Sequence, residues 1–350
     1  MVNYSIFYWI TTYHFSNLFR IKQYFINILE IIKNTTIYKN FISTSVMRTK
    51  ITQWIVTYFR AIFLCAVMLW LLFPVTLTRT YDLLTPFTII LMYLGTLDIA
   101  YNKLGSLKKY RKQTVRYYLM MMGIVPLLLF FALQGFSTDI ATGVLLLAWA
   151  PAGIAAIAFT RLMGGNTLLA LCLAVITTLW LPFTLPILLQ YSVWASIELD
   201  TQWMIIDLIL FCILPIIAAY ITQRKSQKII QTIRPHIDRV SILMIAIMIA
   251  WPVAVNAEQF LSISLLKFVS IVWWLFVLSA LLHTAWRVCF ANTTKENQIA
   301  GSLAKWFMNI SITTVLAAKY FSPEVLLIVI LYEFPRDLML IPFRWFVKKI

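Results

Sequence analysis

The chain has 350 residues, of which 61% are hydrophobic and only 12% are charged, and its formal net charge is +16. A soluble domain of this length needs far more charged side chains to cover its surface, so the composition excludes that class. The basic residues lie in short loops between apolar runs and form no basic domain, which argues against a nucleic-acid partner. The partner that this composition predicts is the lipid bilayer.

Residues 1–46 differ from the rest of the chain. They are rich in Asn, Ile, Tyr, Thr and Lys and hold no apolar run long enough to span a bilayer. Charged residues stand among the apolar ones and no small-residue cleavage site follows them, unlike a signal peptide. Two interpretations stay open: an untranslated or disordered extension with the working start at Met47, or an interfacial amphipathic helix. We expect the transmembrane domain over residues 47–350.

Apolar runs follow one another from there to the C-terminus, and each is long enough to cross the hydrocarbon layer as a helix of about 20 residues. The predicted spans are 56–76, 83–100, 114–134, 138–160, 166–190, 203–222, 240–257, 264–286, 299–319 and 324–343. The prediction is an all-α polytopic membrane protein of about ten transmembrane helices.

The basic residues test this list. When successive loops are assigned to alternate sides, nearly all Lys and Arg after residue 46 fall on one side, and the other side holds only Arg79, Lys267 and Lys319. Cytoplasmic loops of membrane proteins carry this excess of positive charge. We therefore predict a multi-pass protein of the inner (plasma) membrane with both termini in the cytoplasm.

The spans divide into two sets of five with opposite orientation. The first repeat covers about residues 54–190 and the second about residues 203–343. This is the inverted-repeat plan of many secondary transporters. The halves share no strong sequence identity, so the prediction rests on the number and orientation of the spans.

The fourth span is interrupted by Pro151 and Gly153 in the middle of an apolar run. Proline removes a backbone donor, and glycine adopts dihedral angles that other residues avoid. Transporters bind their substrates near the bilayer midplane, where helices are broken in this way. An ordinary proline kink is the alternative.

The stretch from Pro151 to Pro186 resembles the fourth and fifth spans of the bile acid:sodium symporter superfamily. It shows a Pro/Gly break, a Thr, a Gly-Asn turn and a helix that ends near Pro. The positions in register are Thr160, Gly165, Asn166, Thr177, Thr178, Pro182 and Pro186. The segments LMYLGTLDIAYNKL, VPLLLFFAL, ILPIIAAYITQ and FMNISITTVLAAKYFSP, the last with Asn309, are similar to the second, third, sixth and ninth spans. The resemblance covers about residues 55–343.

The resemblance implies a panel domain and a core domain, with broken helices in spans four and nine that cross in the core. It also implies alternating access and an organic anion as substrate. The residues that we expect to open the backbone or contact the substrate are Pro151, Gly153, Thr160, Asn166, Asn309 and Thr313. The polar residues among them fit hydrogen bonding between helices equally well.

The sequence departs from the family at the sodium sites. Sodium-coupled members place oxygen-bearing side chains at positions that here hold Ala156, Ile157, Ala170, Ala174, Ala304 and Met308. These side chains offer no hard oxygen ligand for Na+. We therefore expect the family's sodium sites to be lost, and we predict neither a metal site nor a cofactor.

Three ionisable residues within or beside the spans are candidates for a proton or charge role, because such residues are costly in a membrane. Asp98 lies at the cytoplasmic end of span two, where a side chain that extends to the interface is the alternative. His283 lies near the inner end of span eight and is otherwise structural. Lys305 lies one turn before Asn309, where it would neutralise an anionic substrate or replace a lost cation, unless it is an interfacial lysine.

These observations predict a secondary membrane transporter for a small organic anion. The chain has no HExxH, GxSxG or GxxxxGK[ST] motif, so we do not expect an enzyme. Two alternatives remain. One is an efflux carrier of the wider superfamily, although the broken fourth span lacks the cysteine that arsenite carriers use there. The other is a non-transporting sensor or a degenerate family member that has lost its ion sites.

Overall fold

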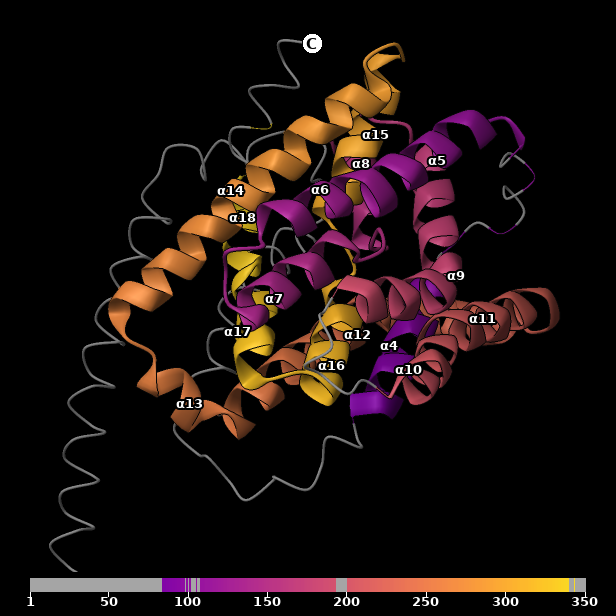
Figure 1. The fold of residues 1–350 in the computed structure, drawn as a ribbon. Coiled ribbons are helices and arrows are strands. Elements are labelled where there is room, and N and C mark those ends of the chain that lie inside the picture. The colour runs from indigo at the N-terminus through magenta and orange to yellow at the C-terminus, as the bar shows by residue number, and fades with distance from the viewer. Residues whose placement is uncertain are drawn as a thin grey trace, which may run out of the picture. The chain divides into compact units, whose positions relative to one another are not determined.

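The computed structural model describes residues 84–97, 99, 101, 105, 108–192, 200–339 and 343, all within one compact unit, Phe59–Ile350. Every regular element in these residues is a helix (Figure 1), as the sequence predicted. The predicted first span, 56–76, and the extension over residues 1–46 lie outside the described residues.

The helices of the first part of the chain are α4 (Leu84–Leu97), α5 (Arg111–Tyr118), the π-helix η3 (Leu119–Ile124), α6 (Val125–Ala132), α7 (Thr138–Ala148), α8 (Ala155–Leu162) and α9 (Thr167–Ser192). Those of the second part are α10 (Thr201–Leu208), the π-helix η4 (Ile209–Ile213), α11 (Leu214–Lys225), α12 (Gln227–Val255), α13 (Ala257–Ser262), α14 (Leu265–Phe290), α15 (Lys295–Trp306), α16 (Ile310–Tyr320), α17 (Pro323–Leu331) and α18 (Glu333–Leu338).

Four continuous helical segments in the described part of the chain are long and apolar enough to cross a membrane. They are Arg111–Ala132, Thr167–Gln190, Thr201–Lys225 and Leu265–Leu282. They coincide with the predicted spans three, five, six and eight. Spans four and nine are each split into two shorter helices, α7 with α8 and α15 with α16.

The start of the seventh span differs from the prediction. Hydropathy placed it at residue 240, but α12 begins at Gln227. The additional residues include Lys228 and Arg234. A helix can continue through such polar residues once it has left the hydrocarbon layer, whereas a search for apolar runs ends at the first charged group.

Two of the membrane-length helices contain a π-helical turn just before a proline. Pro126 follows η3 and Pro215 follows η4, each by two residues. A proline has no N–H, and its ring clashes with the carbonyl group one turn earlier. The wider π turn accommodates this defect, so both helices continue past the proline.

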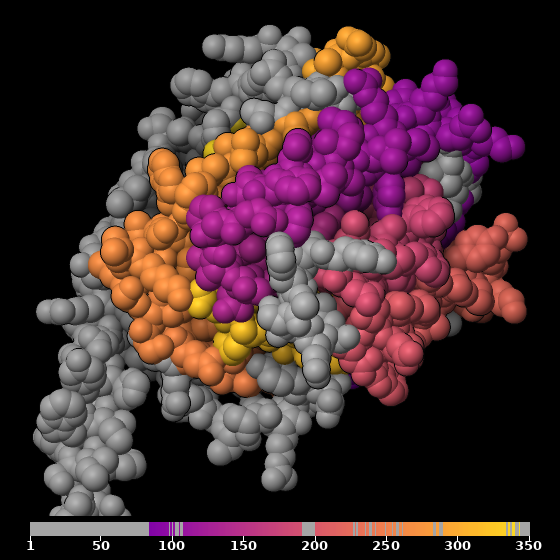
Figure 2. Space-filling view, in the orientation of Figure 1, coloured from indigo at the N-terminus to yellow at the C-terminus, as the bar shows by residue number. Residues whose placement is uncertain are grey.

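Small residues bring several helices close together. A Cβ atom at Gly143 of α7 would lie 2.8 Å from Ile328 of α17, and one at Gly301 of α15 would lie 2.4 Å from the ring of Phe290 of α14. Helices in membranes commonly pack through glycine in this way. The face in Figure 2 shows little of α17, whose residues Val325–Leu331 are all buried.

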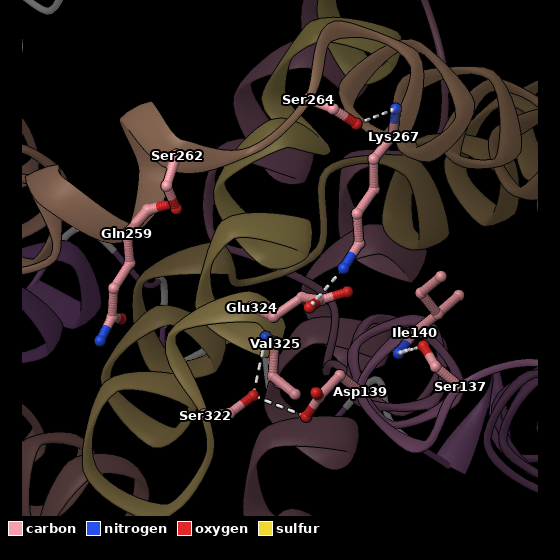
Figure 3. Close-up of polar contacts among 10 residues, drawn as sticks. All are labelled: Ser137, Asp139, Ile140, Gln259, Ser262, Ser264, Lys267, Ser322, Glu324 and Val325. Carbon is pink, nitrogen blue, oxygen red and sulfur yellow. Dashed lines mark hydrogen bonds and ion pairs between the residues drawn. The ribbon is translucent and has the colours of Figure 1, made fainter.

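Polar contacts join the first turns of α7, α14 and α17 (Figure 3). Ser137, Ser264 and Ser322 each cap one of these helices. The helices are connected by an ion pair between Lys267 Nζ and Glu324 Oε2 at 2.9 Å, and by a hydrogen bond from Ser322 Oγ to Asp139 Oδ1 at 2.6 Å. The charge pattern placed all three helix starts on the outer side, and the structure brings them together.

Candidate functional site

The two split helices are bonded to each other at their breaks. Ala152, between α7 and α8, forms an antiparallel bridge with Met308, between α15 and α16. The N–H of Gly153 donates to the carbonyl oxygen of Phe307 at 2.7 Å, and the N–H of Asn309 donates to that of Pro151 at 2.8 Å. Two short extended segments therefore satisfy each other inside a helical protein, as neighbouring β-strands do.

Gly153 makes this approach possible. A Cβ atom at this position would lie 2.6 Å from the carbonyl oxygen of Phe307 and 3.1 Å from the carbonyl carbon and oxygen of Met308. All of these are backbone atoms, which cannot move aside as the end of a side chain can. The predicted break at Pro151 and Gly153 is therefore a true interruption of the helix and not a proline kink.

A side chain from α9 completes the hydrogen bonding of the first break. The N–H of Ala152 donates to Thr177 Oγ1 at 3.0 Å, and the same hydroxyl donates to the carbonyl oxygen of Leu173 at 2.7 Å. Thr177 was not among the predicted site residues. The available signal was that Thr177 and Thr178 are in register with the family in an otherwise apolar stretch of the fifth span.

Asn309 and Thr313 lie at the second break. The Oδ1 atom of Asn309 accepts a hydrogen bond from the N–H of Ile312 and so caps α16, while its Nδ2 donates to Met92 Sδ of α4 at 3.1 Å. The hydroxyl of Thr313 donates to the carbonyl oxygen of Asn309 at 3.0 Å. Both residues therefore stabilise the start of α16. No feature of the sequence predicted Met92 at this place.

Lys305 reaches the first break from α15. Its residue is 1% exposed, and its Nζ donates to the carbonyl oxygens of Ala148 at 2.5 Å and of Ala150 at 3.5 Å. None of the ion pairs found among the described residues includes it. Its burial does not fit a lysine that extends to the membrane interface.

The other predicted residues lie apart from the crossing or outside the description. Asn166 follows α8 and caps α9, and its Nδ2 donates to Tyr110 Oη at 2.9 Å and to Asn297 Oδ1 at 2.7 Å. The length of α8, about 12 Å, separates it from the break. His283 belongs to α14, but its side chain lies outside the described residues, as does the whole of Asp98.

Three buried polar atoms of the helices around the crossing have no hydrogen-bond partner among the described residues. They are Trp149 Nε1 in the first break, Thr314 Oγ1 in α16 and Thr160 Oγ1 near the end of α8, beside Gly165. A buried polar group without a partner costs about 1–3 kcal/mol.

The positions that the resemblance assigns to sodium ligands are apolar, and all of them except the partly buried Ile157 are buried. Ala156, Ala170, Ala174, Ala304 and Met308 are each no more than 3% exposed. These side chains bring no oxygen to the crossing. The other oxygens described there belong to the backbone, to threonine hydroxyls and to the side-chain amide of Asn309.

Four helix ends meet at the crossing. Helices α8 and α16 begin there with a partial positive charge, and α7 and α15 end there with a partial negative charge. The amino group of Lys305 lies on the carbonyl groups at the end of α7. A cavity of about 430 Å³, lined by residues of α5, η3 and α9, contains none of the residues at the crossing.

A comparison with protein families identifies one match. The model of the family described as the sodium bile acid symporter family matches residues 85–263, just over half of the chain. The match includes the first break and ends before Lys305 and Asn309. No curated protein matches the chain.

Proposed function

The chain belongs to the sodium bile acid symporter family, and from this premise we propose that it carries a small organic anion across the membrane through the crossing of its broken helices. Membership makes it a multi-pass membrane protein and a secondary transporter, not an enzyme. The identity of the anion, the coupling and the orientation in the inner membrane belong to the proposal.

The observation that carries the choice of an anion is the charge distribution at the crossing. The starts of α8 and α16 meet the ends of α7 and α15 there, and the ammonium of Lys305 lies on the carbonyl groups at the end of α7, which leaves the positive charge of the two helix starts in excess. Among the described residues no carboxylate pairs with that ammonium. An anionic group would be stabilised by these charges, as at other helix N-termini in discontinuous transporter helices. Thr160 and Thr314 supply hydroxyl groups for its remaining polar atoms.

We infer that the helices form a panel and a core that move against each other. In the described residues α4 packs against α11 and α12, while α7 packs against α17 and α14 against α15. Helices α4, α11 and α12 would form the panel, and α7, α14, α15 and α17 would form the core. With about ten spans and both termini in the cytoplasm, rocking of the core would expose the crossing to each side in turn.

The test is thermal melting of the detergent-purified protein with a panel of organic anions, in Na+ or in K+, followed by uptake of any stabilising anion into sealed vesicles. A ligand at 100 times its Kd stabilises the native state by about 2.7 kcal/mol. We expect one class of anion to raise the Tm equally in both salts and to be taken up. If no anion does so, the protein is a non-transporting member of the family.

A further inference from the structure

We propose that the ammonium group of Lys305 is a resident cation of the helix crossing, held on backbone oxygens that would otherwise bind a diffusible metal ion, and that it makes the carrier independent of Na+. This inference rests on the proposed function, since it assigns the cation of the same site.

The oxygens that hold the ammonium form part of a cation site. Ala148 is the last residue of α7 and Ala150 lies in the break, so their carbonyl groups point beyond the end of the helix. The last carbonyls of a helix have no partner within it and carry a partial negative charge. In discontinuous membrane helices such carbonyls coordinate Na+ or H+.

Lys305 satisfies these oxygens from a neighbouring helix. The side chain crosses from α15 to α7 over 157 positions of sequence, and its Nζ lies 2.5 Å from the carbonyl oxygen of Ala148. An ammonium group has three donors and no acceptor, so it binds carbonyl oxygens as a metal cation does. Two of its donors are used here, and one remains for the substrate.

The side chains that the resemblance assigns to sodium binding are missing from the crossing. The corresponding buried positions hold alanine at 156, 170, 174 and 304 and methionine at 308. Na+ needs several hard oxygen ligands, and the alanines and the methionine provide none. Of the buried side-chain oxygens described beside the breaks, those of Thr177, Asn309 and Thr313 already take part in hydrogen bonds with the backbone. A tethered ammonium needs fewer ligands, because the covalent chain holds it in place. The loss of oxygen ligands and the presence of Lys305 therefore have one explanation.

The first experiment uses the unmodified full chain. Its Tm is measured in NaCl, KCl and choline chloride at equal ionic strength, without any organic anion. Because the cation of the crossing is covalently attached, we expect the same Tm in all three salts. A Tm that is higher in NaCl than in the other two salts would show that the protein binds Na+ and would overturn the proposal.

The second experiment removes the ammonium. Lys305→Ala takes away three methylene groups and the charge, and we expect its Tm to fall by several degrees in choline chloride. We expect NaCl or propylammonium chloride to raise the Tm of this variant again by at least about 2 °C. Propylammonium has the three carbons and the ammonium group that the substitution removes. An unchanged Tm would overturn the proposal, and so would a fall that neither cation reduces, since the lysine would then act through packing alone.

Two control variants separate charge from packing. Lys305→Met keeps most of the volume without the charge, so it should also be less stable and should not respond to added cations. A Lys305→Met protein as stable as the unmodified chain would contradict the proposal. Lys267→Met removes a lysine that is 47% exposed, so it should lower the Tm less than either change at Lys305 and should not respond to added cations.

Failure of this inference can be distinguished from failure of the proposed function. The cation measurements contain no organic anion, so they can be interpreted even if no transported anion is found. Uptake of an organic anion that requires Na+ would overturn the role of Lys305 and would keep the carrier function.

Discussion

Gly153 illustrates how single residues determine the crossing, because the absence of a side chain there brings two backbones into hydrogen-bond contact. Pro151 also contributes through a group that it lacks: it has no N–H, so no backbone donor is left unpaired at its position in the break. Thr177 then supplies the one side-chain acceptor that the break needs. Each of these residues acts on the backbone, and none bears a charge.

We expect Gly153→Ala to destabilise the protein and to abolish transport. The added Cβ would meet backbone atoms at 2.6 and 3.1 Å, and such overpacking typically costs about 1–3 kcal/mol. The measurement is the Tm together with anion uptake. Gly135→Ala is the matched control, since a Cβ at Gly135 meets nothing within 4 Å. Equal behaviour of the two variants would contradict the geometry of the crossing.

Thr177→Val tests the hydroxyl that accepts from Ala152. Valine keeps the shape of the side chain but leaves a buried N–H without a partner, which costs about 1–3 kcal/mol. Thr177→Ser retains the hydroxyl and should recover most of that loss in a melting experiment. If serine is no more stable than valine, the hydrogen bond makes no net contribution.

Sequence reasoning found some of these residues and missed others for a physical reason. Pro151 and Gly153 are visible because they interrupt an apolar run. The partners of Lys305 were not predictable, because Ala148 and Ala150 are distant in sequence and are used through their carbonyl groups, which every residue has. Asn166 was expected at the crossing, but the structure places it at the far end of α8, where it caps α9.

At the scale of helices, hydropathy located most of the spans but not their internal structure. The break in span four has a local signal, whereas that in span nine has none: residues 307–309 are Phe, Met and Asn, without Pro or Gly. Only the family resemblance predicted it. The second break is stabilised by its contact with the first, so no property of span nine alone reveals it.

The close packing of α14 and α15 can be tested by a pair of substitutions. Gly301→Ala should lower the Tm, because its Cβ would lie 2.4 Å from the Phe290 ring. Phe290→Ala alone should cost about 3–5 kcal/mol through the cavity it creates. In the Phe290→Ala background, adding Gly301→Ala should cost nothing further. A fully additive double variant would show that the two residues do not interact.

At the scale of the whole molecule, one polar cluster connects helices of the two proposed domains. Asp207 of α10 accepts hydrogen bonds from Lys319 Nζ at 2.5 Å and from Tyr320 Oη at 2.7 Å, both at the end of α16. Lys319 also donates to Thr85 Oγ1 of α4. The charge pattern places these residues on the outer side. We therefore expect this cluster to hold the two domains together there and to separate when the carrier opens outward.

Asp207→Asn is expected to destabilise the protein more than Glu324→Gln does. The side chains of the Lys319–Asp207 pair are 24% and 9% exposed, whereas those of the Lys267–Glu324 pair are 47% and 23% exposed. Removing one partner of a partly buried pair should cost roughly 1–3 kcal/mol, and an exposed pair about 0–1 kcal/mol. Melting of both variants in one buffer gives the comparison. A larger loss of stability for Glu324→Gln would contradict the expectation that the Lys319–Asp207 pair contributes more than the Lys267–Glu324 pair.

The position of Lys305 has a consequence for the energy source of transport. A covalently attached cation does not cross the membrane with the substrate, so it draws no work from a Na+ gradient. For a substrate that moves without a proton, net flux would then follow the electrochemical potential of the substrate alone. Across a membrane at 100 mV, negative inside, the free energy of a monovalent anion falls by about 2.3 kcal/mol when it leaves the cell, equivalent to about a 50-fold concentration ratio. In such a membrane, this carrier would export its anion.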